Sequence, residues 1–195
     1  DAQGAVRKAM EAGDRVMEVE FPPLPTSVLE STSVSSDDVS EANLRLAIDF
    51  AKFWAKEGKR VVIVLPDWPE KKRAMELSSD GITEQEEPVK NIRFGCLKNE
   101  RKGSFLERVW TKTGIDIAIR DDDDMFVVIG ASAQELPDVE NFVNSVGERP
   151  VILFNLKLDT SRGDLGLPAF PRRALHYRFQ SRIRPVYYLR TRRDR

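Results

Sequence analysis

Residues 149–168 read RPVILFNLKLDTSRGDLGLP, an apolar run that passes into a polar segment containing two glycines. A short apolar run bounded by turn residues is typical of a strand that is buried on both faces of a parallel sheet. In open α/β sheets, ligands bind just beyond the carboxyl ends of such strands. The stretch therefore predicts a central strand over 150–156, followed by a polar loop that is a candidate site.

Similar apolar segments recur along the whole chain. The expected strands cover 15–21, 60–65, 89–96, 125–129, 150–156 and 185–190, and the expected helices cover 2–13, 44–55, 69–77, 104–112 and 136–146. Ser40 is the expected cap of the second helix. Strand and helix alternate at least four times, which implies parallel pairing through crossover helices. The predicted fold class is α/β, a three-layer sandwich with a mostly parallel, Rossmann-like sheet.

The totals exclude several kinds of site. The chain has 195 residues, a formal net charge of −1, one cysteine and one histidine. It therefore cannot form an internal disulfide, a thiolate zinc cluster or a multi-histidine metal site. It contains no apolar run of membrane-spanning length and no recognisable signal peptide. We expect one α/β domain over residues 1–195, and the strand-like segment just before the end leaves a C-terminal truncation open.

The C-terminal part of the chain is strongly basic. Residues 172–195 contain nine arginines and one acid, Asp194, with tyrosines and a phenylalanine between them. Such a surface could stack on bases, meet anionic lipid headgroups or bind an acidic protein patch. Because the net charge is close to zero, we expect no nucleic-acid binding. The candidate docking surface comprises Arg172, Arg173, Tyr177, Arg178, Arg182 and Arg184.

A second candidate is the polar cluster that follows the strand at 150–156. Its members are Asn155, Asp159, Arg162 and Asp164, and Asp67 would join them if the two strands were neighbours. The arginine could hold a carboxylate or phosphate, and two close acids could act as acid and base. We favour a structural network of ion pairs and turns, since no nucleophile, metal cage or histidine accompanies the acids. The sequence therefore predicts no catalytic residue, cofactor or metal ligand.

Four smaller features have structural interpretations that we prefer over functional ones. The segment at 130–137 could hold an anion before a helix, but an ordinary cap is expected. The acids at 121–124 are expected in an exposed turn or tip, because metal loops need alternating ligands. We expect His176 to be packed and hydrogen-bonded, and Cys96 to be a small buried hydrophobe.

Several segments in their order resemble the domain-of-unknown-function family nineteen-ninety-five of chloroplasts and cyanobacteria. They are EVEFPPLP at 18–25, LPDWPE at 65–70, FNLKLDT at 154–160, GDLG at 163–166, HYRF at 176–179 and RPVYYLR at 184–190. The resemblance extends from about residue 2 to residue 193 and is densest over 151–190. It is weak over 81–124, where specificity for a partner could lie. Family members usually continue past the tyrosine-rich strand.

The resemblance implies a plastid protein of the stroma or of the stromal face of the thylakoid membrane. It implies a non-enzymatic role in photosystem II assembly, with photosystem II subunits or other assembly factors as partners and peripheral association with the thylakoid membrane. Two alternatives stay open. Some relatives carry the domain beside an adenylate kinase, which keeps a nucleotide- or phosphometabolite-binding regulatory domain in view. The other alternative is a permanent peripheral subunit of a photosynthetic complex.

Overall fold

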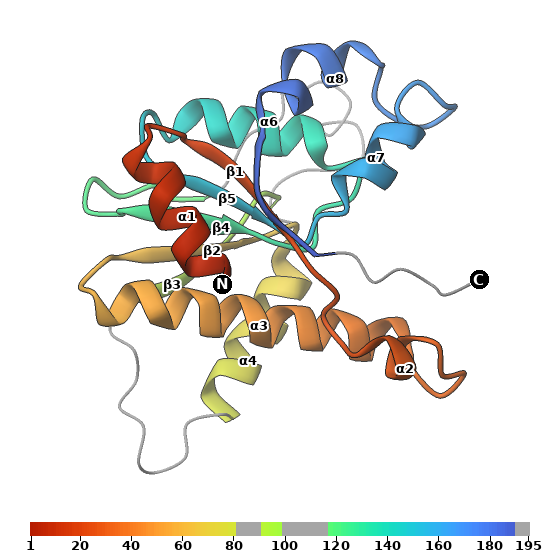
Figure 1. Ribbon diagram of the computed structural model, residues 1–195, viewed down its shortest axis with the longest axis horizontal. Coiled ribbons are helices and arrows are strands. Elements are labelled where there is room, and N and C mark those ends of the chain that lie inside the picture. The colour runs from red at the N-terminus through yellow and green to blue at the C-terminus, as the bar shows by residue number, and fades with distance from the viewer. Residues whose placement is uncertain (81–90, 99–116, 190–195) are drawn as a thin grey trace.

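A six-stranded sheet forms the centre of the molecule (Figure 1), as described by a computed structural model for residues 1–80, 91–98 and 117–189. The strand order is β3-β2-β4-β5-β1-β6, and every neighbouring pair is parallel. This arrangement confirms the α/β, Rossmann-like class expected from the sequence. The strands are β1 (Val16–Glu20), β2 (Val61–Leu65), β3 (Ile92–Cys96), β4 (Met125–Val128), β5 (Val151–Phe154) and β6 (Arg184–Tyr188).

Helices cover both faces of the sheet and complete the three layers. One buried cluster joins the sheet to α1, α3 and α4, and a second cluster joins the opposite face to α6, α7 and α8. The expected helix at 104–112 lies outside the described residues. The described helices are α1 (Ala2–Glu11), α2 (Thr26–Leu29), α3 (Ser36–Lys56), α4 (Trp68–Asp80), α6 (Leu136–Ser145), α7 (Leu158–Asp164) and α8 (Ala174–Arg178), with a 3₁₀ turn, η1 (Gln180–Arg182).

The three central strands β2, β4 and β5 are buried along their whole length. Alternate residues of β2 point to opposite faces, so Val62 and Val64 join one cluster while Val61, Ile63 and Leu65 join the other. A strand covered on both sides needs apolar residues at every position. This requirement explains why these segments are continuous apolar runs in the sequence.

The long helix α3 begins earlier than the sequence predicted, because Ser35 caps it and Ser40 does not. The Ser35 hydroxyl accepts a hydrogen bond from the Asp38 backbone N–H at 3.1 Å, and the Asp38 carboxylate accepts one from the Ser35 N–H at 2.9 Å. This reciprocal capping box satisfies two backbone donors. The hydrogen bonds that Ser35 donates lower the pKa of Asp38. As a result Ser40 lies inside the helix.

The acidic run at 121–124 is not an exposed tip throughout, contrary to expectation. Asp123 is only 4% exposed and forms an ion pair with Arg93 of β3, whose Nε donates to it at 2.8 Å. The backbone N–H of Arg120 also donates to this carboxylate, at 2.7 Å. Asp121 and Asp122 are exposed as expected. A buried carboxylate needs such partners, so the run anchors the turn before β4.

Candidate functional site

The carboxyl edge of the sheet contains a point where the chain connections diverge. From β2 the chain runs through α4 to β3 at one edge, whereas from β4 it runs through α6 to β5 in the opposite direction. Between two such strands no crossover helix closes the end of the sheet, and a crevice results. The gap between the ends of β2 and β4 is therefore the first place to look for a site.

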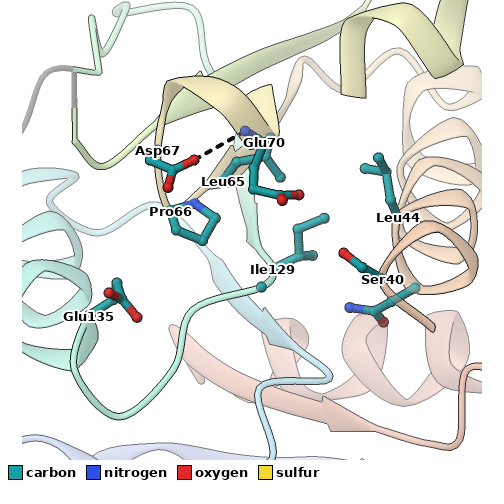
Figure 2. A pocket seen from close by; sticks show the side chains of 10 residues that line it. Ser40, Leu44, Leu65, Pro66, Asp67, Glu70, Ile129 and Glu135 are labelled. Atoms are coloured by element: carbon teal, nitrogen blue, oxygen red, sulfur yellow. Dashed lines mark hydrogen bonds between the residues drawn. The ribbon is translucent and has the colours of Figure 1, made fainter. Parts of the chain in front are cut away.

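An acidic pocket of about 280 Å³ occupies this crevice. Figure 2 shows Ser40 and Leu44 of α3 on one side, with Pro66, Asp67 and Glu70 across from them. The described residues that line it include three carboxylates and no lysine or arginine. The acidic pocket is lined by Ser40, Asn43, Leu44, Leu65, Pro66, Asp67, Glu70, Ile129, Gly130 and Glu135.

Asp67 and Glu135, two of the pocket acids, form local hydrogen bonds at helix N-termini. Asp67 accepts a hydrogen bond from the Glu70 backbone N–H at 3.1 Å, in the first turn of α4 (Figure 2). Glu135 accepts one from the Ser132 N–H at 3.1 Å and one from the Ser132 hydroxyl at 2.5 Å, just before α6. No side chain caps the N-terminus of α6, contrary to the ordinary cap expected for the segment at 130–137. The Glu135 carboxylate beside it nevertheless leaves this helix start poorly suited to an anion.

The charge state of Glu135 depends on its neighbours. Burial alone would raise its pKa, but the Ser132 hydrogen bonds and the nearby ammonium of Lys98 lower the pKa overall. Lys98 lies 3.4 Å from Glu135 and 3.2 Å from Asp138, and these two acids raise the pKa of Lys98 against the effect of its burial. At the rim of the acidic pocket Lys98 therefore lies between Glu135 and Asp138, while Asp67 and Glu70 line the pocket itself.

These charges determine which ligands the acidic pocket can accept. Phosphate groups would meet carboxylates at the place where phosphate-binding folds present backbone N–H groups or lysine. Among the described residues no group of three or more His, Cys, Asp or Glu side chains is arranged to hold a metal ion. The pocket is thus suited to a neutral or cationic group, and its lining carries no set of residues for nucleophilic catalysis.

A second hollow, the apolar cleft, adjoins the acidic pocket and encloses about 440 Å³. Ser40, Asn43 and Gly130 line both hollows. The two charged residues of the cleft, Glu20 and Lys157, have opposite signs. The apolar cleft is lined by Glu20, Phe21, Pro22, Pro23, Leu29, Ser36, Val39, Ser40, Asn43, Gly130, Asn155, Lys157, Thr160 and Leu189.

Asn155 fixes the floor of the apolar cleft. Its backbone is left-handed, with a φ of 53°, which asparagine tolerates better than most residues. Its side-chain oxygen accepts a hydrogen bond from the Phe21 N–H at 2.8 Å, and its amide nitrogen donates to the Asn43 side chain at 2.8 Å. One side chain thus ties the end of β5 to the end of β1 and to α3.

The outer wall of the apolar cleft includes an exposed one-turn helix. None of the residues of α2 is buried, and its Val28 and Leu29 are 38% and 37% exposed. On another side of the cleft Leu189, which follows β6, is 52% exposed, and its N–H donates to the Glu20 carbonyl at 2.8 Å. Large apolar side chains at the rim of a hollow are typical of interaction sites.

The polar cluster expected after β5 is only partly assembled as the sequence suggested. Asp67 lies apart from it, because β4 separates β2 from β5. The expected loop is the short helix α7, which contains Asp159, Arg162 and Asp164. Asn155 lines the apolar cleft, and Asp67 lines the acidic pocket beside it. Within α7, Arg162 is exposed and Asp164 is half-buried. Sequence reasoning missed the contribution of α3 and of the proline-rich segment after β1.

The basic residues of the candidate docking surface fall into two groups. Arg178 forms a bidentate ion pair with Glu140 of α6, and Nε of Arg184 lies 3.8 Å from the Asp14 carboxylate. These two arginines are therefore partly neutralised. All six members are exposed, and the second group, which has no ion pair to a described residue, comprises Arg172, Arg173, Tyr177 and Arg182 around α8.

His176 and Cys96 have the structural roles expected of them. The His176 ring is half-buried and its Nδ1 lies 3.4 Å from the Gln180 side-chain oxygen. Cys96 is buried at the end of β3, with 4% exposure. Neither side chain lines the two hollows. In the part of the chain that the structure describes, no helix has the length and apolar character needed to cross a membrane.

Comparison with known proteins gives one match. A family model described as "Domain of unknown function (DUF1995)" matches residues 1–195. No curated protein and no solved structure matches the chain significantly. The match to the family covers the sheet, both hollows and the basic residues around α8.

Proposed function

The chain belongs to the DUF1995 family, and we propose that it is an assembly factor for photosystem II, the role that the sequence resemblance implies. It acts at the stromal face of the thylakoid membrane of chloroplasts by binding protein and not as an enzyme. Its partners are photosystem II subunits or other assembly factors. Within the family we propose that it works like the low photosystem II accumulation protein three, which the same signature segments resemble.

The observation that carries the proposal is the apolar cleft at the carboxyl edge of the sheet. Its volume of about 440 Å³ is large enough for a few apolar side chains, and Phe21, Pro22, Pro23 and Val39 line it. An unassembled membrane subunit exposes apolar segments before it finds its neighbours. Shielding such a segment requires an apolar hollow, and the apolar cleft supports this role.

The rim of the cleft supports the same occupant. Leu29 and Leu189 each keep more than a third of their surface exposed, and burying such side chains against a partner contributes about 1 kcal/mol apiece. Glu20 and Lys157 balance each other in formal charge, so the cleft selects for apolar contact over charge. The proline-rich entry after β1 keeps this wall stiff, since proline fixes its backbone φ.

A nucleotide or phosphometabolite is the second candidate ligand. Its support is the crevice between β2 and β4, the place where ligands bind in open α/β sheets. The chemistry of the lining opposes it, because Asp67, Glu70 and Glu135 would repel phosphate. Thermal unfolding with millimolar ATP or sugar phosphate tests this candidate. We expect no shift in Tm, and a shift that depends on Asp67 would favour the regulatory alternative.

Affinity capture from detergent-solubilised thylakoids tests the main proposal. The wild-type chain should recover photosystem II subunits or assembly factors, and a variant with Leu29→Asp and Leu189→Asp should lose them. The matched control is Met75→Asp, which places a charge on an apolar residue of α4 that is 48% exposed and lies outside the cleft. Equal recovery by the cleft variant and the control would reject the cleft as the binding site.

Native gel electrophoresis of thylakoid complexes separates a transient factor from a permanent peripheral subunit. We expect only a small fraction of the protein to migrate with assembled photosystem II on native gels, because an assembly factor leaves the finished complex. Migration of nearly all the protein with one complex would favour the permanent subunit.

A further inference from the structure

A loop between α7 and α8, the corner loop (residues 165–173), projects from one corner of the molecule in Figure 1. Its first residue, Leu165, is buried and anchors it to the core. Its next apolar residue, Leu167, is 50% exposed, and Pro168 beside it is exposed as well. The loop therefore presents an apolar tip on a projecting part of the chain, and it lines neither the acidic pocket nor the apolar cleft.

The corner loop is closed by its own hydrogen bonds. The Gly166 N–H donates to the Pro171 carbonyl at 2.8 Å, across the base of the loop. Gly166 has a φ of 88°, and a Cβ there would lie 2.8 Å from Cγ of Arg173. Ala169 also has a positive φ, 68°, which is uncommon for a residue with a side chain. A loop that keeps such a backbone holds its tip in one defined position.

The surroundings of the loop are basic, although the chain as a whole is not. Between Lys157 and Arg184 the sequence holds seven Lys and Arg residues and two Asp, a formal charge of +5, whereas the entire chain has −1. Arg172, Arg173 and Arg182 make no ion pair with any residue that the structure describes. Of these cations Arg178 and Arg184 pair with Glu140 and Asp14, whereas Arg172 and Arg173 lie in the corner loop itself and Arg182 lies in η1 after α8.

We propose that the corner loop docks the protein on a membrane surface that carries anionic lipid headgroups. Leu167 enters the interfacial layer, and Arg172, Arg173 and Arg182 contact the headgroups. Tyr177 of α8 is 74% exposed, and tyrosine is favoured at the boundary between lipid and water. An apolar tip near arginines that form no ion pair with a described residue combines the two contributions that hold peripheral proteins on anionic bilayers.

An acidic protein patch is a poorer fit for this corner. Specific protein contacts use hollows and interlocking surfaces, whereas the tip projects outward with arginines spread beside it. A fluid layer of headgroups adapts to that shape without a matching pocket. The proposal rests on the proposed function only in placing the chain at a membrane, and it concerns a surface separate from the apolar cleft.

Co-sedimentation of the purified chain with protein-free vesicles tests this proposal. We expect binding to vesicles with phosphatidylglycerol, weaker binding as salt rises, and little binding to pure phosphatidylcholine. The variant with Arg172→Glu and Arg182→Glu should bind at least about thirtyfold more weakly, since each basic residue near the surface contributes about a factor of five. Leu167→Ser should weaken binding by about fivefold to tenfold, with an unchanged dependence on salt.

The matched control is a variant with Lys56→Glu and Lys72→Glu, which changes the net charge equally at exposed positions of α3 and α4. It should bind almost like the wild type, and circular dichroism should give all variants the same fold. Equal binding to both kinds of vesicle, no binding to either, or equal loss in the two charge variants would overturn the proposal. Because the vesicles contain no protein, these outcomes leave the cleft proposal untouched, and loss of subunit capture by the cleft variant leaves this one untouched.

Discussion

Asn155 is the residue that holds the floor of the apolar cleft together, and its contribution can be measured. Replacing it with alanine removes the hydrogen bonds to Phe21 and Asn43 and places alanine at a positive φ. We expect the free energy of unfolding to fall by about 3 kcal/mol, from about 1 kcal/mol per hydrogen bond and about 1 kcal/mol of backbone strain. Asn155→Gly should cost about 2 kcal/mol, because glycine relieves the strain. Urea unfolding measures both, and equal losses would show that backbone strain at this position is negligible.

The ion pair between Arg93 and Asp123 predicts a dependence of stability on pH. Burial would raise the pKa of Asp123, but the hydrogen bonds from Arg93 and Arg120 lower it overall. A carboxylate with a lowered pKa in the folded state stabilises the protein above its unfolded pKa of about 4, and that stability is lost as pH falls further. We therefore expect the free energy of unfolding to drop below about pH 4.

Asp123→Asn should flatten that acid dependence and lower stability at pH 7 by about 2 to 3 kcal/mol. This estimate lies below the range for fully buried pairs, because the Arg93 side chain keeps 23% of its exposure. Asp122→Asn is the control, since the exposed pair of Asp122 with Arg60 contributes less than about 1 kcal/mol. Urea unfolding from pH 7 to pH 3 measures both variants. If the free energy of unfolding of Asp123→Asn fell below about pH 4 as steeply as that of the wild type, the pH dependence would belong to other groups.

At the scale of elements, the N-terminal half of α3 lies over both hollows and depends on its cap. Ser35→Ala removes the hydroxyl that accepts the Asp38 N–H, and should cost about 1 kcal/mol. Because the unsatisfied donor lies in the first turn, hydrogen exchange should accelerate there first. Ser27→Ala, in the exposed helix α2, is the control and should change stability by less than about 0.5 kcal/mol. Equal exchange in the two variants would mean that packing alone holds this end of α3.

The elements that the sequence predicts well are those with a repeated pattern. The buried runs at 61–65, 125–128 and 151–154 form central strands because full burial demands continuous apolar residues. The first residue of a helix is harder to predict, because a serine caps a helix only where the backbone turns. The sequence does not show whether Ser35 or Ser40 lies at that turn. The helix α7 was hidden by the glycine and the aspartates of its seven residues, which have poor helix propensity.

At the scale of the whole molecule, the sequence predicts the layers of the fold but not which strand ends meet. Periodicity carries no information on strand order, so Asp67 could be grouped with Asn155 although β4 lies between their strands. For the same reason the apolar cleft could not be foreseen, because it joins α2, α3, the ends of β1 and β5, and Leu189. The proline-rich segment after β1 was the one local signal of a rigid wall at this edge.

The two proposed surfaces lie in different parts of the fold and bind different partners. The apolar cleft at the carboxyl edge of the sheet takes an apolar protein segment, while the corner loop between α7 and α8 meets lipid headgroups. Their residues do not overlap, since neither Leu167 nor the arginines of the corner line the cleft. The charges differ accordingly, since Arg172 and Arg173 lie in the corner loop while Glu20 and Lys157 of the cleft have opposite signs.

Photocrosslinking from the cleft in intact chloroplasts tests the central claim most directly. A photoreactive amino acid at position 189 places the reactive group on the rim of the cleft, and the same group at position 75 on α4 is the control. Irradiation during photosystem II assembly should link position 189 to a photosystem II subunit or an assembly factor and leave position 75 unlinked. No adduct at position 189, or the same adducts at both positions, would contradict the account.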